Sequence, residues 1–250
     1  AGTLAGLLGI GGGIIIVPVL AMVFRNQGVP IEVLMHVSIG TSLATIVVTS
    51  LSSIRAHQKR GAIDWSVFRQ ITPGIILGAL LGSVVADAIP GAELRIAFAI
   101  FMYLVATQMM IAGTPAPHRK LPHTPGMLGA GVVIGTISAL MGVGGGSMSV
   151  PFMTWCNVHI RQAVATSAAS GLPIALAGTA GFIFTGWGSD ALPAWSLGYV
   201  NLPAFTGIVI ASILFAPLGA RLAHTIPPKL LKRIFAVLLY VLATRILLTS

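Results

Sequence analysis

The sequence predicts an all-α integral membrane protein built from two inverted-topology repeats. Three observations support this prediction: the composition, a duplicated glycine motif and the placement of the basic residues. Of the 250 residues, 56% are hydrophobic and 8% are charged, and the mean hydropathy is +0.97. These values lie outside the range of water-soluble domains. At about 20 residues per span, the chain has room for roughly six to eight membrane helices and little else.

The second observation is an internal repeat. A GxGGG motif followed by Val-Pro occurs at residues 9–18 and again at 142–151, with a constant offset of 133 residues. Further matches follow in the same order: Thr41-Ser42 with Thr166-Ser167, residues 61–64 with 198–201, and Tyr103 and Thr107 with Tyr240 and Thr244. Ordered matches of this kind indicate two copies of one unit, as in many secondary transporters.

The repeat divides the chain into three parts. We assign residues 1–112 to the first repeat, 113–125 to a polar cytoplasmic linker and 126–250 to the second repeat. The sequence opens at Ala1 inside an apolar run, so we expect residues to be missing before it.

The third observation concerns the 14 lysines and arginines. If the first apolar stretch of each repeat crosses the membrane, these residues divide seven to seven between the two sides. If residues 1–24 and 126–156 are instead re-entrant hairpins, eleven lie on one side and three, Arg25, Arg95 and Arg245, on the other. Such an excess is typical of cytoplasmic loops. The charges therefore favour re-entrant hairpins.

This interpretation gives six transmembrane helices. The predicted spans are residues 33–54, 65–89, 94–112, 162–187, 199–226 and 230–249. Three crossings per repeat invert the second copy relative to the first, and the two hairpins then meet near the midplane. The alternative is eight crossings, with the first helix of each repeat broken at its glycine motif.

The glycine motifs predict an anion site. Each glycine inside a helix loses about 1 kcal/mol relative to alanine, so a run of them is expected to break the helix. The broken turn exposes backbone N–H groups, and the following half-helix adds the positive end of its dipole. We expect substrate binding by Gly11, Gly12 and Gly13 and by Gly144, Gly145 and Gly146. The alternative is that these glycines only allow helices to approach closely.

The repeated Thr-Ser pairs are the second part of the predicted site. Thr41-Ser42 and Thr166-Ser167 lie near the midplane in the predicted spans, where their hydroxyl groups can donate to an oxyanion. The alternative is a hydrogen bond to a helix carbonyl one turn earlier. His36 and Arg161 each precede a Thr-Ser pair by five residues. Either can attract an anion, and for both residues a snorkelling or topology role is the alternative.

Other functions find no support in the sequence. The five carboxylates fall at or outside span ends, so none is placed as a buried proton relay. Catalytic and metal-binding motifs are missing, and Cys156 is the single cysteine. The sequence therefore predicts no enzyme, no cofactor, no metal and no nucleic-acid partner. Its expected partners are a small anionic substrate and the lipid bilayer.

The doubled GxGGG-x-x-x-VP pattern, the Thr-Ser pairs and residues 61–64 resemble the TauE/SafE sulfite exporter family, also called the TSUP permeases. The resemblance covers both halves of the chain. It implies a multi-pass permease of the bacterial inner membrane for sulfite, sulfoacetate, other sulfonates or related organic acids. Cys156 fits no functional-cysteine pattern of the thiosulfate-uptake relatives. Export is the expected direction, and a passive anion channel is the alternative function.

Overall fold

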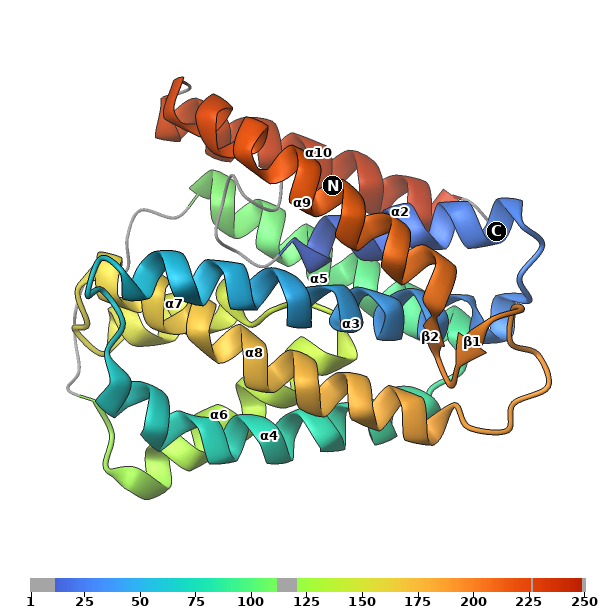
Figure 1. Cartoon of the computed structure of the whole chain (residues 1–250), viewed down its shortest axis with the longest axis horizontal. Helices are drawn as coiled ribbons and strands as arrows, with labels where there is room; N and C mark the ends of the chain where they lie inside the picture. Colours follow the sequence, from blue (N-terminus) through green and yellow to red (C-terminus); the bar gives the residue numbers. More distant parts are fainter. Residues whose placement is uncertain (1–11, 112–120, 226, 249–250) are drawn as a thin grey trace.

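The computed structural model describes residues 12–111, 121–225 and 227–248, and these ranges are almost entirely helical (Figure 1). The first repeat contains α2 (Gly13–Asn26), α3 (Ile31–Gln58), α4 (Trp65–Ala88) and α5 (Gly91–Ile111). The second contains α6 (Thr124–Leu140), α7 (Gly146–Trp155), α8 (Ile160–Thr185), α9 (Leu202–Thr225) and α10 (Pro228–Leu248). Two short strands, β1 (Ser196–Leu197) and β2 (Val200–Asn201), precede α9. Most of the predicted linker and the first arm of the first hairpin lie outside the described residues.

Several helices have the length and composition of membrane spans. Within the described residues, α3, α4, α5 and α8 are long and apolar enough to cross a bilayer. Shorter apolar helices are α2, α6 and the part of α9 at Leu202–Leu214. The prediction of an all-α membrane protein is therefore confirmed, and the count of six spans stays a prediction.

One predicted boundary is wrong. The span expected to begin at residue 199 begins at Leu202, because an antiparallel β-hairpin pairs Ser196 with Asn201 and Leu197 with Val200. Gly198 forms the turn with a φ of +53°, in the left-handed region that glycine favours. The side-chain oxygen of Asn201 then accepts a hydrogen bond from the Ala204 N–H at 3.1 Å and caps α9.

Close packing of α4 against α6 depends on glycine. Gly74, Gly78 and Gly82 of α4 face the backbone carbonyls of Leu128, Val132 and Thr136 of α6 so closely that a Cβ would strike them. The residue numbers rise together along both helices, so α4 and α6 run parallel. The Gly-x-x-x-Gly spacing is typical of close helix contacts in membranes.

The α6–α7 pair begins and ends at one end of the bundle. α8 also runs parallel to α4, since Ala165 packs on Ile63 and Gly181 faces Ser83. α6 begins beside the first half of α4. α7 ends only four residues, 156–159, before the start of α8, so the end of α7 lies at the same end of the bundle as the start of α6. With 10 residues, α7 is about 15 Å long, half the thickness of a bilayer core.

Matching helices of the two repeats run antiparallel. On α5 and α10, the Tyr103 hydroxyl lies 2.7 Å from Thr244 Oγ1, and the Tyr240 hydroxyl lies 2.7 Å from Thr107 Oγ1. Each threonine donates to the carbonyl of the tyrosine one turn earlier in its own helix, so the tyrosine hydroxyls are the donors between helices. Residue numbers therefore increase along α5 in the direction in which they decrease along α10, so the two helices run antiparallel. The same is true of α3 and α8, since Leu43 packs on Gly178 and Ile54 packs on the cluster of Ala165 and Ala169.

Candidate functional site

The two glycine turns lie against each other inside the bundle. A Cβ at Gly13 would strike the carbonyl oxygen of Gly142 and would lie 3.0 Å from Val143 Cα. Gly12 and Gly145, the residues before α2 and α7, have left-handed φ values of +58° and +74°. α2 and α7 therefore both begin at this contact and run toward opposite ends of the bundle (Figure 1). The predicted meeting of the turns is present, whereas Gly11 lies outside the described residues.

The start of α7 has uncommitted backbone donors. The N–H groups of Met148 and Ser149 bond to the Gly145 carbonyl, and no side chain caps the helix. In the described part of the chain, the N–H groups of residues 144–147 have no backbone acceptor. Together with the helix dipole, such groups favour an anion.

Three buried serine residues lie at or near this second turn, in addition to the half-buried Ser147, whose Oγ atom also has no partner among the described residues. Ser138 and Ser149 are fully buried and Ser167 is 1% exposed, and none has a hydrogen-bond partner among the described residues. A Cβ placed on Gly145 would lie 3.4 Å from Ser149 Oγ and 3.7 Å from Ser138 Oγ. Ser167 lies one helical turn before Gly171, whose Cβ position is 3.0 Å from the Gly144 carbonyl.

The described part of the first turn and the helix that follows it, residues 12–26, contain no serine or threonine hydroxyl. Ile14 and Ile16 occupy the positions that Ser147 and Ser149 occupy after the second motif. Ser138 and Ser149 correspond to Ala5 and Ile16 in the first repeat, so residues shared by the two repeats do not identify them. The signal that identifies Ser149 is this difference between the two motifs.

The predicted threonines serve a different contact. Thr41 Oγ1 accepts a hydrogen bond from the Asn201 N–H, and Thr166 Oγ1 accepts one from the Asp64 N–H, each at 2.9 Å. Each threonine thus holds the helix cap of the other repeat. Asp64 accepts from the backbone N–H groups of Ser66 and Val67 and is the N-cap of α4.

Ser42 also has a structural partner. Its hydroxyl donates to the Gly142 carbonyl at 2.9 Å and ties α3 to the second turn. Of the four residues in the predicted Thr-Ser pairs, only Ser167 is left with an unpartnered hydroxyl among the described residues.

The structure does not bring His36 or Arg161 to the turns. His36 is 4% exposed, and its Nε2 donates to the Ala86 carbonyl at 2.9 Å. Its ring stacks on Tyr199 with centroids 5.0 Å apart, and the Tyr199 hydroxyl donates to Asp87. Arg161 is exposed at the start of α8. Within the described ranges, no group of three or more His, Cys, Asp or Glu residues is arranged to hold a metal ion.

Comparison with known proteins shows which protein family this chain resembles. The family model described as sulfite exporter TauE/SafE matches residues 1–246. A probable membrane transporter protein of Haemophilus influenzae is 37% identical over 245 residues, which cover 97% of this chain and 92% of the relative. A probable membrane transporter protein of Methanocaldococcus jannaschii is 31% identical over 254 residues, which cover 99% and 91%. No solved structure matches.

Apolar helices of spanning length around a buried glycine turn, together with these relatives, define a multi-pass membrane transporter. The chain belongs to the sulfite exporter TauE/SafE family. This confirms the resemblance seen in the duplicated motif.

Proposed function

We propose that this transporter moves small sulfur-containing or organic anions, such as sulfite, sulfoacetate or other sulfonates, across the bacterial inner membrane in the direction of export. The anion binds at the second glycine turn, between the two broken hairpins. One observation carries the proposal: backbone N–H groups and three buried serine hydroxyls that have no partner among the described residues lie at or near the start of α7.

The energetics of the site favour a ligand. A buried hydroxyl without a partner costs about 1–3 kcal/mol, so three of them around one turn are a substantial penalty in the empty state. An oxyanion offers several acceptor atoms to these donors. All donors at the turn are neutral, so they can bind an anion without the strong retention expected of a buried cation.

We further propose that the two repeats have inverted topology, with α6–α7 as a re-entrant hairpin. The antiparallel packing of α5 with α10 and of α3 with α8 supports this, because equivalent helices run in opposite directions. The parallel course of α4, α6 and α8 supports the hairpin, since its two arms share one end of the bundle. This arrangement places both helix starts at the same depth.

Substitution of Gly145 by alanine tests the site. The added methyl group would lie between Ser138 and Ser149 and 2.5 Å from the Ile174 Cδ1 atom, which must shift. We expect Gly145→Ala to lower sulfonate flux in proteoliposomes at least about tenfold, the effect of roughly 1.4 kcal/mol.

Gly188→Ala is the matched control. Gly188 has a φ of +85°, so its substitution has a similar backbone cost, but no atom lies within 4 Å of the added methyl group. We expect Gly188→Ala to transport within about twofold of wild type, since roughly 0.4 kcal/mol corresponds to a twofold change. If Gly145→Ala also retains wild-type flux, the anion does not pass the second turn.

A further inference from the structure

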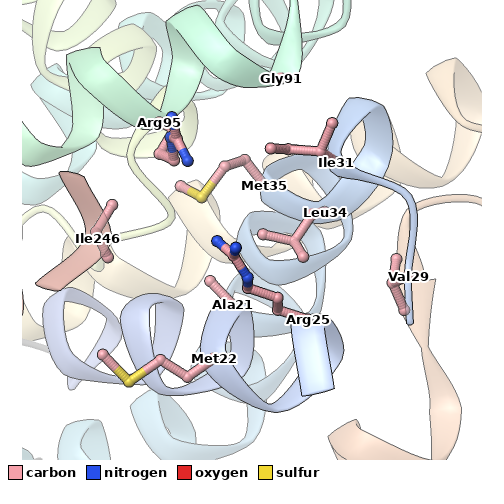
Figure 2. Close-up of a pocket in the computed structure, with 10 residues that line it drawn as sticks. All are labelled: Ala21, Met22, Arg25, Val29, Ile31, Leu34, Met35, Gly91, Arg95 and Ile246. Atoms are coloured by element: carbon pink, nitrogen blue, oxygen red, sulfur yellow. The ribbon is translucent and has the colours of Figure 1, made fainter. Parts of the chain in front are cut away.

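A second candidate site lies at the end of the bundle where α2 ends and α3 and α5 begin. Figure 2 shows this pocket, which has a volume of about 220 Å³. Two of its lining residues are arginines, Arg25 from the last turn of α2 and Arg95 from the first turns of α5. α2 thus links this pocket to the interior turn, since Arg25 lies 12 residues, or about 18 Å, beyond Gly13.

The pocket combines positive charge with apolar walls. In Figure 2 the Arg25 guanidinium points from α2 toward Met35 and the side of the pocket where Arg95 lies. Ala21, Met22, Leu34, Met35 and Ile246 supply most of the remaining surface. Arginine is well suited to carboxylate and sulfonate groups, because its planar fork can form two parallel hydrogen bonds.

Helix starts add to the positive potential. Ile31 and Gly91 line the pocket and are the first residues of α3 and α5. A Cβ at Gly91 would lie 2.5 Å from the carbonyl oxygens of Ile31 and Glu32, so only glycine lets these two helix starts meet so closely. Glu32 and Glu93, the acidic residues in the first turns, are exposed and are not among the lining residues.

We propose that this pocket is a second anion site, which binds small organic anions with one sulfonate or carboxylate group and a short apolar part. The anionic group lies at Arg25 and Arg95, and the apolar part contacts Met22, Leu34 and Met35. The volume is below the range of about 300–1,000 Å³ typical of drug-sized ligands, which limits the apolar part to a few carbon atoms. The site takes its ligand independently of the proposed interior site.

Equilibrium binding to the purified full chain in phosphatidylcholine nanodiscs tests this proposal. We expect 1-propanesulfonate and butyrate to bind, sulfate to bind more weakly for lack of an apolar part, and a neutral dialkyl sulfone not to bind. Arg25→Gln and Arg95→Gln should each weaken propanesulfonate binding about tenfold or more, as expected for loss of a charge-assisted hydrogen bond. Arg25→Lys should have an intermediate effect, because it keeps the charge and loses the fork.

Two controls separate this site from its alternatives. Arg161→Gln removes an exposed arginine at the start of α8 and should leave binding unchanged. In a Gly145→Ala background, which impairs the interior site, the remaining propanesulfonate binding should still depend on Arg25 and Arg95, so failure of the interior site and failure of this pocket give different results. Unchanged binding in both arginine-to-glutamine variants, or in Arg25→Lys if those variants do not fold, overturns the proposal. So does arginine-dependent stabilisation seen only with phosphatidylglycerol, which would identify a lipid-headgroup site.

Discussion

Ser42 and Ser167 occupy equivalent positions in the two repeats, yet they have different surroundings. Ser42 donates to the Gly142 carbonyl, whereas the Ser167 hydroxyl has no partner among the described residues. The serine of the first repeat therefore makes a structural hydrogen bond, whereas the serine of the second repeat has a hydroxyl group that can donate to a ligand. This difference separates the contribution of a serine to folding from its contribution to binding.

Serine-to-alanine variants test that distinction. Ser138→Ala, Ser149→Ala and Ser167→Ala each remove a buried hydroxyl without a partner, so we expect thermal stability to be unchanged or raised. Each should raise the KM of anion transport several-fold, since one neutral hydrogen bond contributes about 0.5–1.5 kcal/mol. Thermal unfolding and transport kinetics in the same detergent and lipid measure both effects.

Ser42→Ala is the matched control for this series. It removes a hydroxyl that has a partner, so we expect it to lower the free energy of unfolding by about 1 kcal/mol. If all four variants lose stability equally, the three unpartnered serines have structural partners instead of a ligand.

The sequence predicted the site only in part, for a reason visible at single residues. Repetition singled out Thr41 and Thr166, but these residues are repeated because each supports a cap in the other half of the molecule. A ligand site need not be symmetric. Ser138 and Ser149 belong to one repeat only, so a search for repeated residues does not find them.

At the scale of helices, the proposed re-entrant hairpins explain why the glycine motifs interrupt apolar segments. α7 has 10 residues and is too short to cross a bilayer, and it is joined by four residues to α8. In the proposed topology, the loops after α2 and α7 lie on opposite sides of the membrane.

Cysteine labelling tests this arrangement of the hairpins. Cys156 is buried and can be replaced by serine, and Gln27 and His159 are exposed in the loops after α2 and α7. On the Cys156→Ser background, we expect Gln27→Cys to react with an impermeant maleimide in intact cells. His159→Cys should react only after permeabilisation. Reaction of both cysteines in intact cells would contradict the inverted arrangement.

Helix positions were more predictable than the connections between them. Hydropathy predicted the long helices, whereas the partner that α6 provides for the glycines of α4 is seen only in the structure. The β-hairpin before α9 was not predicted, because its strands have two residues each and depend on the left-handed turn at Gly198. Such a short pattern is too weak to detect in an apolar sequence.

For the whole molecule, residues that the repeat matches in sequence also lie together in the structure. Tyr103 and Thr107 match Tyr240 and Thr244 in the repeat, and Tyr103 bonds to Thr244 and Thr107 to Tyr240, although the sequence predicted no contact between them. The pocket at Arg25 and Arg95 was not predictable in this way. Its two arginines are unrelated by the repeat, and they come together because α2 and α5 both pack against α3.

The positions of the acidic residues in the whole chain bear on the force that would drive anion transport. None of the five carboxylates is buried, and they lie at helix ends or in loops. A proton-coupled carrier usually needs an ionisable group inside the membrane. An anion leaving a cell with a negative interior is already driven by roughly 2.3 kcal/mol per charge per 100 mV, so export requires no coupling ion.

The most direct test of this account is anion flux in proteoliposomes under a potential set by potassium and valinomycin. We expect flux of sulfite or sulfoacetate to follow the imposed potential, to ignore a proton gradient and to show saturable counterflow. Counterflow distinguishes a carrier from a passive channel. Flux that follows the proton gradient and is lost in His36→Gln, or no flux of any anion in wild-type protein, would contradict the account.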